Sequence, residues 1–247
     1  MSFDYNSIPV GFYDEVVQKG NPVRRLWHQS KFDRVADCLP RGHGLSVLDI
    51  GCFAGTFLSM LPSTRFSRQL GIDILPAQIE YATRVYGRDF REFRHVQSSG
   101  TIRELGERFD CVTIIEVIEH LQGPEIREML SAALAMLKPG GKLVLTTPNY
   151  ASAWPLIELM LNKLADVTYE EQHITKFNWF TVVQRLYEIV PELRTEATLE
   201  FRTSIHFITP FLAAISLSGA RKLARLVPHR RWHLPFGNLM MLVFTKS

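Results

Sequence analysis

The residues best suited to chemistry are two carboxylates and a histidine within five positions of each other. Glu116, Glu119 and His120 follow an apolar run over residues 109–115 that reads as a strand. If the chain makes one helical turn there, the three side chains share a face, because positions three and four apart are neighbours. Such a cluster can act as a general base with its orienting partner, or can hold a divalent ion. His173 is a further candidate for either role.

A glycine turn is the second candidate site. Residues 47–58 run from an apolar strand through Gly51 and Gly55 into a helix. Glycine lets the main chain approach a ligand closely, and the start of a helix offers unpaired N–H groups. Asp73 closes the next apolar run, and a carboxylate roughly 20 residues after such a turn accepts hydrogen bonds from ribose hydroxyls in α/β proteins. The pattern predicts a nucleotide-type cofactor, although the turn lacks the Gly-x-Gly-x-x-Gly spacing of dinucleotide enzymes.

Four motifs occur in order between residues 47 and 149. They are Asp49-x-Gly51-x-x-x-Gly55, Gly71-Ile-Asp73-Ile, the run 109–121 and the run 137–149. Together they resemble the class I S-adenosylmethionine-dependent methyltransferases. The resemblance implies S-adenosylmethionine as methyl donor and S-adenosylhomocysteine as product.

The same resemblance suggests roles for the donor-site residues. Asp49 is expected to fix the turn by accepting backbone N–H bonds. Phe53 stands where the family usually has glycine, and its ring either packs on the cofactor or faces the core. Gln97 or Ser98 would replace the family's acidic residue near the adenine. The full set of expected cofactor contacts is Asp49, Gly51, Cys52, Phe53, Gly55, Asp73, Ile74, Gln97, Ser98 and Glu116.

Two mechanisms stay open at the acceptor side. In the first, His120 or His173 removes the proton of an acceptor hydroxyl, with Glu116 as a carboxylate partner. In the second, a divalent metal such as magnesium binds Glu116, Glu119, His120 and His173. Glu-x-x-Glu-His resembles the metal-binding motif of ubiquinone-pathway O-methyltransferases and small-RNA 2′-O-methyltransferases. The same motif also occurs in methyltransferases that modify small molecules and glycans without metal.

Alternating strands and helices are needed to position these residues. The pattern predicts an α/β protein with a doubly wound, mostly parallel sheet. The resemblance implies seven strands in the Rossmann-like methyltransferase fold, completed by an antiparallel pair. Residues 1–247 would form a single domain, with a helical cap (1–43), a cofactor-binding core (44–149) and acceptor-side insertions (150–176 and 204–236). Strands are expected at 45–50, 69–74, 92–96, 109–115, 141–147, 193–202 and 238–245. Helices are expected at 14–19, 24–39, 55–61, 76–86, 101–106, 124–137, 151–168 and 177–190.

Composition limits the class of protein. The 247 residues are 46% hydrophobic and 21% charged, which suits one folded domain, and the formal net charge of +3 is too small to require nucleic acid or a membrane as partner. Three cysteines without a Cys-x-x-Cys pair indicate a reducing compartment, so we expect a cytoplasmic protein. The longest apolar stretch, 207–217, is too short to cross a bilayer.

The insertion 204–236 leaves three interpretations. A basic amphipathic helix can lie on a membrane surface, the same cations can neutralise phosphates of RNA or of a diphosphate-linked acceptor, or the insertion can be a packed lid. The function predicted is O-methylation of a small-molecule, glycan or lipid-linked acceptor. A metal-dependent RNA 2′-O-methyltransferase and an inactive methyltransferase-like binding protein are the alternatives. The basic residues are Arg221, Lys222, Arg225, His229, Arg230, Arg231 and His233.

Overall fold

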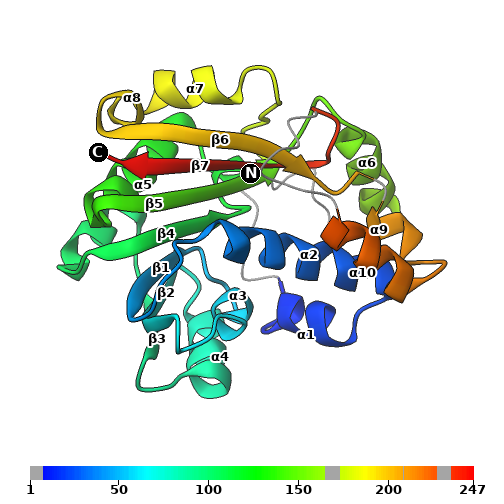
Figure 1. Ribbon diagram of the computed structural model, residues 1–247, viewed down its shortest axis with the longest axis horizontal. Helices are drawn as coiled ribbons and strands as arrows, with labels where there is room; N and C mark the ends of the chain where they lie inside the picture. Colours follow the sequence, from blue (N-terminus) through cyan, green and yellow to red (C-terminus); the bar gives the residue numbers. More distant parts are fainter. Residues whose placement is uncertain (1–7, 165–172, 208, 227–234) are drawn as a thin grey trace.

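A single seven-stranded sheet forms the centre of the protein (Figure 1). The computed structural model describes residues 8–164, 173–207, 209–226 and 235–247. The strand order is β3-β2-β1-β4-β5-β7-β6, with β1 to β5 parallel and β7 antiparallel to both of its neighbours. This confirms the doubly wound, mostly parallel sheet. The strands are β1 (Leu45–Ile50), β2 (Phe66–Asp73), β3 (Arg91–His95), β4 (Phe109–Ile115), β5 (Leu137–Pro148), β6 (Ala197–Ile205) and β7 (Leu239–Lys246).

Helices cover both faces of the sheet, which explains why its central strands are almost wholly apolar. Because side chains alternate between faces, neighbours in one strand enter different cores: Leu48 packs in one cluster and Val47 in the other. The helices are α1 (Phe12–Lys19), α2 (Pro22–Cys38), α3 (Thr56–Ser59), α4 (Pro76–Tyr86), α5 (Gly123–Met136), α6 (Trp154–Leu164), α7 (Val182–Ile189), α8 (Glu192–Glu196), α9 (Thr209–Leu212) and α10 (Leu217–Leu226), with 3₁₀ turns η2 (Ser99–Leu105) and η3 (Ile118–His120).

Three expected boundaries were wrong by four residues or more. Residues 193–196, predicted to begin a strand, belong to the short helix α8, and β6 starts at Ala197. Helix α7 begins at Val182 rather than at 177, because the Asn178 side chain accepts the N–H groups of Phe180 and Thr181 in a turn before it. Strand β5 already begins at Leu137, where its register with β4 shifts. The predicted helical residues 165–168 lie outside the described residues.

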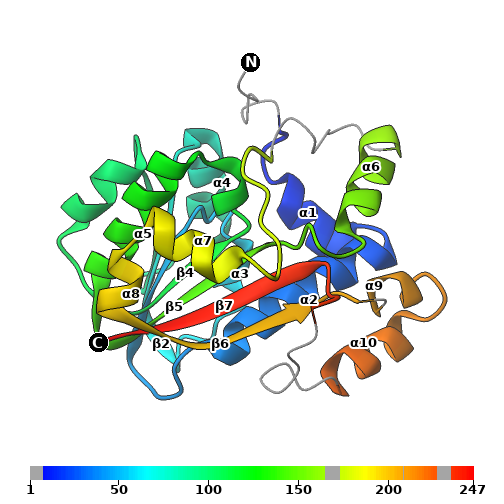
Figure 2. The same cartoon turned by 90° about the horizontal axis from the view of Figure 1, so that it is seen from above.

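The elements that surround the site lie beyond the carboxyl ends of the parallel strands. Helices α1, α2, α6, α9 and α10 gather at this end of the molecule (Figures 1 and 2). Helix α2 packs against α9 and α10 through Leu26, Ala213 and Ala220. Among the described residues, no helix is long and apolar enough to cross a membrane. The two inserted segments therefore meet the amino-terminal helices at the edge where ligands bind in such sheets.

Candidate active site

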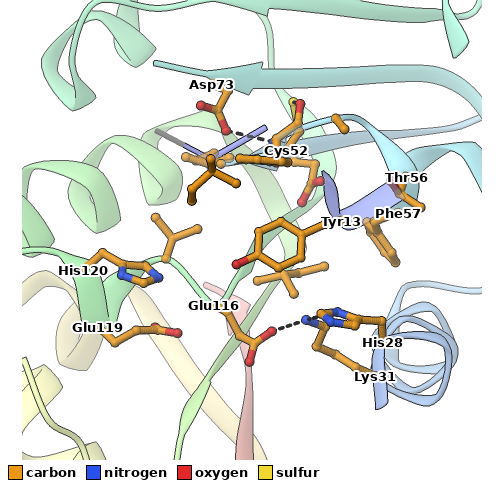
Figure 3. A pocket seen from close by; sticks show the side chains of 18 of the residues that line it. Tyr13, His28, Lys31, Cys52, Thr56, Phe57, Asp73, Glu116, Glu119 and His120 are labelled. Atoms are coloured by element: carbon orange, nitrogen blue, oxygen red, sulfur yellow. Dashed lines mark hydrogen bonds and ion pairs between the residues drawn. The ribbon is translucent and has the colours of Figure 1, made fainter. Parts of the chain in front are cut away.

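One cavity of about 370 Å³ contains most of the residues singled out from the sequence (Figure 3). Its walls include Asp49, Gly51, Cys52, Phe53, Asp73, Ile74, Glu116, Glu119, His120 and His173. Gly55, Gln97 and Ser98 are not among its lining residues, whereas their neighbours Thr56, Val96 and Ser99 are. The glycine turn and the Glu-x-x-Glu-His cluster thus open into the same space.

The glycine turn requires left-handed backbone at three positions. Gly51 has φ +77° and Gly55 has φ +76°, and Phe53 between them has φ +48°. A Cβ atom at Gly51 would lie 2.5 Å from Cγ2 of Val117, so only glycine fits. The left-handed angle at Phe53 also explains why a glycine is common at this position in the family.

Asp49 does not fix the turn in the way expected. The N–H groups of Gly51 and Cys52 donate to the Ile72 carbonyl (2.9 and 3.0 Å), so β2 holds the turn. The Asp49 carboxylate instead accepts a hydrogen bond from the Thr113 hydroxyl (2.6 Å) on β4. Burial raises the pKa of Asp49 to about 7, although the Thr113 hydrogen bond acts in the opposite direction. Its role is therefore to connect β1 and β4 beneath the turn.

Asp73 lies at the end of β2 with its carboxylate against the turn. One oxygen accepts the Phe53 N–H (2.8 Å) and the other accepts the Leu75 N–H (2.9 Å). Burial raises its pKa, and these backbone hydrogen bonds partly offset the rise. Each carboxylate oxygen can accept a second hydrogen bond, which leaves capacity for ligand hydroxyls.

Helix α1 covers the glycine turn. The Tyr13 ring contacts the Phe53 ring edge to face, with centroids 5.1 Å apart. The helix is fastened by buried Asp14, which accepts hydrogen bonds from the hydroxyls of Thr56 (3.0 Å), Tyr81 (2.8 Å) and Tyr86 (2.6 Å). One carboxylate thus connects α1 to α3 and α4, and it holds Tyr13 over the turn.

Helix α2 supplies a cation that the sequence did not reveal. Lys31, with a side chain only 5% exposed, forms an ion pair with Glu116 (Figure 3). The Glu116 backbone is left-handed (φ +53°), and its N–H donates to the carbonyl and hydroxyl of Thr146. His28 Nδ1 lies 3.4 Å from Lys31 Nζ, and burial together with Lys31 lowers the His28 pKa well below 6.5. His28 is therefore a neutral ring at neutral pH. The only sign in the sequence that this helix reaches the cavity was the basic and aromatic run 24–28.

His173 belongs to a second polar group, whose other members, Glu158 and Tyr150, were not predicted from the sequence. Its Nδ1 lies 2.6 Å from Glu158 Oε1, and the Tyr150 hydroxyl donates to the same oxygen (2.8 Å). Burial opposes ionisation of Glu158, but the hydrogen bonds from His173 and Tyr150 outweigh it and lower its pKa. An ionised Glu158 favours the tautomer of a neutral His173 that carries its proton on Nδ1, and in that tautomer the lone pair is on Nε2. One sign of this group was present in the sequence, because Glu158 is an isolated acid in the apolar run 153–161.

Glu119, His120 and His173 form the candidate metal cluster. Each offers one ligand atom, and these atoms lie within 4.8 Å of one another. Glu119 Oε2 accepts the Thr147 hydroxyl (3.0 Å), whereas the buried Oε1 has no hydrogen-bond partner among the described residues. Burial, followed by the charge of Glu116, raises the Glu119 pKa to about 8. A divalent cation would fit this donor set and would satisfy the unpaired oxygen. The fourth residue of the predicted set, Glu116, is directed toward Lys31.

Comparison with known proteins identifies the family. Residues 23–188 match a family model described as a methyltransferase domain. The chain belongs to this methyltransferase family. The ubiquinone biosynthesis O-methyltransferase of Leptothrix cholodnii is 30% identical over 132 residues, and the match covers 52% of each protein. The chain thus spans about half the length of the curated relatives it matches.

Solved methyltransferase structures share the fold over nearly the whole chain. A Haloferax volcanii protein, described as a putative methyltransferase in complex with the Trm112 activator, has a TM-score of 0.61 at 16% identity and covers 94% of this chain and 96% of its own. The N-methyltransferase NodS of Bradyrhizobium japonicum, solved with S-adenosylhomocysteine, has a TM-score of 0.56 at 19% identity, with 93% and 90% covered. The resemblance to the class I methyltransferase fold is confirmed.

Proposed function

We propose that the protein transfers a methyl group from S-adenosylmethionine to an oxygen atom of a small or lipid-linked acceptor. The observation that carries this proposal is the shared cavity. At one end lie the glycine turn and Asp73, which suit a nucleoside with ribose hydroxyls, and at the other lie Glu119, His120 and His173. A donor and an acceptor bound in this space would meet without a further site.

Methyl transfer is an in-line displacement on a sulfonium carbon, so the protein needs to position the acceptor oxygen and to remove its proton. In the tautomer of His173 that the Glu158 carboxylate favours, with the proton on Nδ1, Nε2 is suited to accept the acceptor's proton. His120 lies beside it, with ring centroids 5.1 Å apart. Where a divalent cation is bound, Glu119, His120 and His173 would hold it, and it would lower the pKa of a coordinated hydroxyl.

The acceptor end of the cavity favours a molecule with apolar or ring-shaped parts. Trp27, Trp154, Ile157 and Phe211 contribute to its lining. Aromatic side chains stack on planar or sugar rings and offer apolar surface to a chain. A glycan, a quinone precursor or a secondary metabolite, free or attached to a lipid, would suit such walls. RNA is the second candidate, and the modest net charge of +3 disfavours it.

Titration calorimetry with S-adenosylhomocysteine tests the donor half of the proposal. Asp73→Asn should weaken binding about 10- to 150-fold, the effect of losing a charged hydrogen-bond acceptor. Asp89→Asn, a change at an exposed carboxylate outside the cavity, is the control. No heat from the wild type would instead favour an inactive, methyltransferase-like binding protein.

Methyl-labelled S-adenosylmethionine tests the acceptor half. The enzyme is incubated separately with a lipid extract, with a water-soluble small-molecule extract and with RNA. Label in either of the first two fractions supports the proposal. Label confined to RNA would replace it with the RNA methyltransferase alternative.

A further inference from the structure

The carboxyl-terminal part of the chain carries cations without a single acidic residue. After Glu200 the sequence contains no Asp or Glu, but it contains Arg202, Arg221, Lys222, Arg225, Arg230, Arg231 and Lys246. Lys222 and Arg225 are exposed on α10. Asp33 on α2 interacts electrostatically with Arg225 and Arg221, so it offsets part of their charge.

The same segment exposes large apolar side chains. Helix α10 packs on α2 with buried Ala220, and Arg221 donates to the Gln29 side chain (2.6 Å). Its outer face is left with Lys222, Leu223, Arg225 and Leu226, in which two cations alternate with two leucines. Leu226 is 76% exposed, and Ile215 in the preceding turn is 86% exposed. Large apolar groups beside cations, with no acid on the helix, are the pattern of a surface that binds anionic lipid.

The helix before α10 in the same insertion, α9, lines the cavity. Phe211 of α9 both lines the cavity and is 44% exposed. Ile157 of α6 also lines the cavity, while Leu156 and Leu159 on the same helix are exposed. Helices α6, α9 and α10 lie at the same end of the molecule in both views (Figures 1 and 2). Helices α6 and α9 therefore both line the cavity and expose apolar side chains.

We propose that the outer face of α9 and α10 docks on an anionic lipid bilayer, with the cavity opening toward the membrane. The cations would lie at the headgroups, and Ile215, Leu223 and Leu226 would enter the boundary with the acyl chains. A nucleic acid would also attract the cations, but its phosphates offer nothing for exposed isoleucine and leucine side chains. The docking proposal does not depend on the proposed function. Delivery of a lipid-linked acceptor to the cavity rests in addition on the proposed function.

Vesicle co-sedimentation tests the docking. The wild type should bind vesicles containing phosphatidylcholine and phosphatidylglycerol far more tightly than vesicles of phosphatidylcholine alone. Lys222→Gln/Arg225→Gln should lower the partition coefficient about 25-fold, because each cation near an anionic surface contributes about fivefold. The control, Arg41→Gln/Arg108→Gln, removes two exposed cations just before β1 and β4, at the opposite edge of the sheet. It should leave binding within about twofold of the wild type.

A second pair of variants tests the apolar part. Ile215→Ser/Leu226→Ser should reduce binding at least tenfold, whereas Met60→Ser/Phe180→Ser, which changes exposed apolar residues outside the cavity, should not. Near-UV circular dichroism checks that each variant is folded. Equal wild-type binding to both vesicle types, or equal losses in the test and control pairs, would overturn the proposal. Tighter binding to single-stranded RNA, lost in the Lys222 and Arg225 variant, would assign the surface to nucleic acid instead. Calorimetry with S-adenosylhomocysteine, run in parallel, reports separately on the proposed function.

Discussion

Replacing Lys31 with methionine should show how much the ion pair beneath the acceptor site contributes to folding. Lys31→Met keeps most of the side-chain volume but leaves the Glu116 carboxylate without its cation. The two side chains are 5% and 21% exposed, so both are largely removed from water. Breaking a buried ion pair by removing one partner costs about 3–5 kcal/mol. Because Glu116 keeps about a fifth of its surface, water can partly replace Lys31, and we expect a loss of about 2–3 kcal/mol.

Urea unfolding and calorimetry measure this loss. For a domain of this size, about 2–4 °C of melting temperature correspond to each kcal/mol, so the expected drop is about 5–10 °C. The double variant Lys31→Met/Glu116→Gln removes the stranded charge and should recover at least about 1 kcal/mol. Lys142→Met is the matched control, because its pair with Glu200 (2.8 Å) lies nearer the surface, and it should cost no more than about 1 kcal/mol. A Lys31→Met loss as small as that of Lys142→Met would refute the reasoning, as would a double variant less stable than the single one.

Three further predictions concern the site and the residues packed around it. His206 is buried and stacked on Trp27. Burial, followed by the charges of Lys31 and Arg34, lowers its pKa well below 6.5. The neutral His206 ring therefore stabilises the fold fully above pH 6.5, and this stabilisation is lost as the pH falls. Relative to His206→Phe, the wild type should lose about 1.4 kcal/mol of unfolding free energy between pH 7.5 and 5.5, and equal slopes in urea titrations would contradict this. Calorimetry with Mn²⁺ should show binding that Glu119→Gln abolishes and Glu116→Gln leaves within about threefold, and the opposite order would place the ion at Glu116. Phe53→Gly should be more stable than Phe53→Ala by about 1 kcal/mol because of the left-handed backbone, and the usual order, with alanine more stable, would show that this angle is not required.

The sheet could be predicted because its signal is local. Apolar runs of strand length, glycine turns and the acid at the end of β2 follow one another along the chain, and parallel crossovers bring their ends to one edge. Asp73 and the Glu119 to His120 segment were placed at the cavity for this reason. The boundary errors at 177 and 193 arose where a side-chain turn or a short helix replaced the regular pattern.

The long-range partners could not be predicted in the same way. Lys31 and Glu116 are separated by 85 positions, and no periodicity connects α2 with the end of β4. Glu158 and His173 are 15 positions apart, and no spacing in the sequence pairs them. Such pairs depend on how the caps pack on the sheet, which is decided by shape and burial across the whole domain.

The insertion that carries α9 and α10 begins and ends at paired residues of neighbouring antiparallel strands. Ile205 at the end of β6 lies opposite Leu239 at the start of β7, and the Asn238 side chain donates to the His206 carbonyl. The segment therefore leaves the sheet and returns to it at a single place, like the loop of a long hairpin. Evolution could exchange such a segment as a unit, with no change to the strands that hold the donor turn. Diversification of acceptors within this lineage should then concentrate in length and sequence changes between residues 206 and 238, while the glycine turn and Asp73 stay the same.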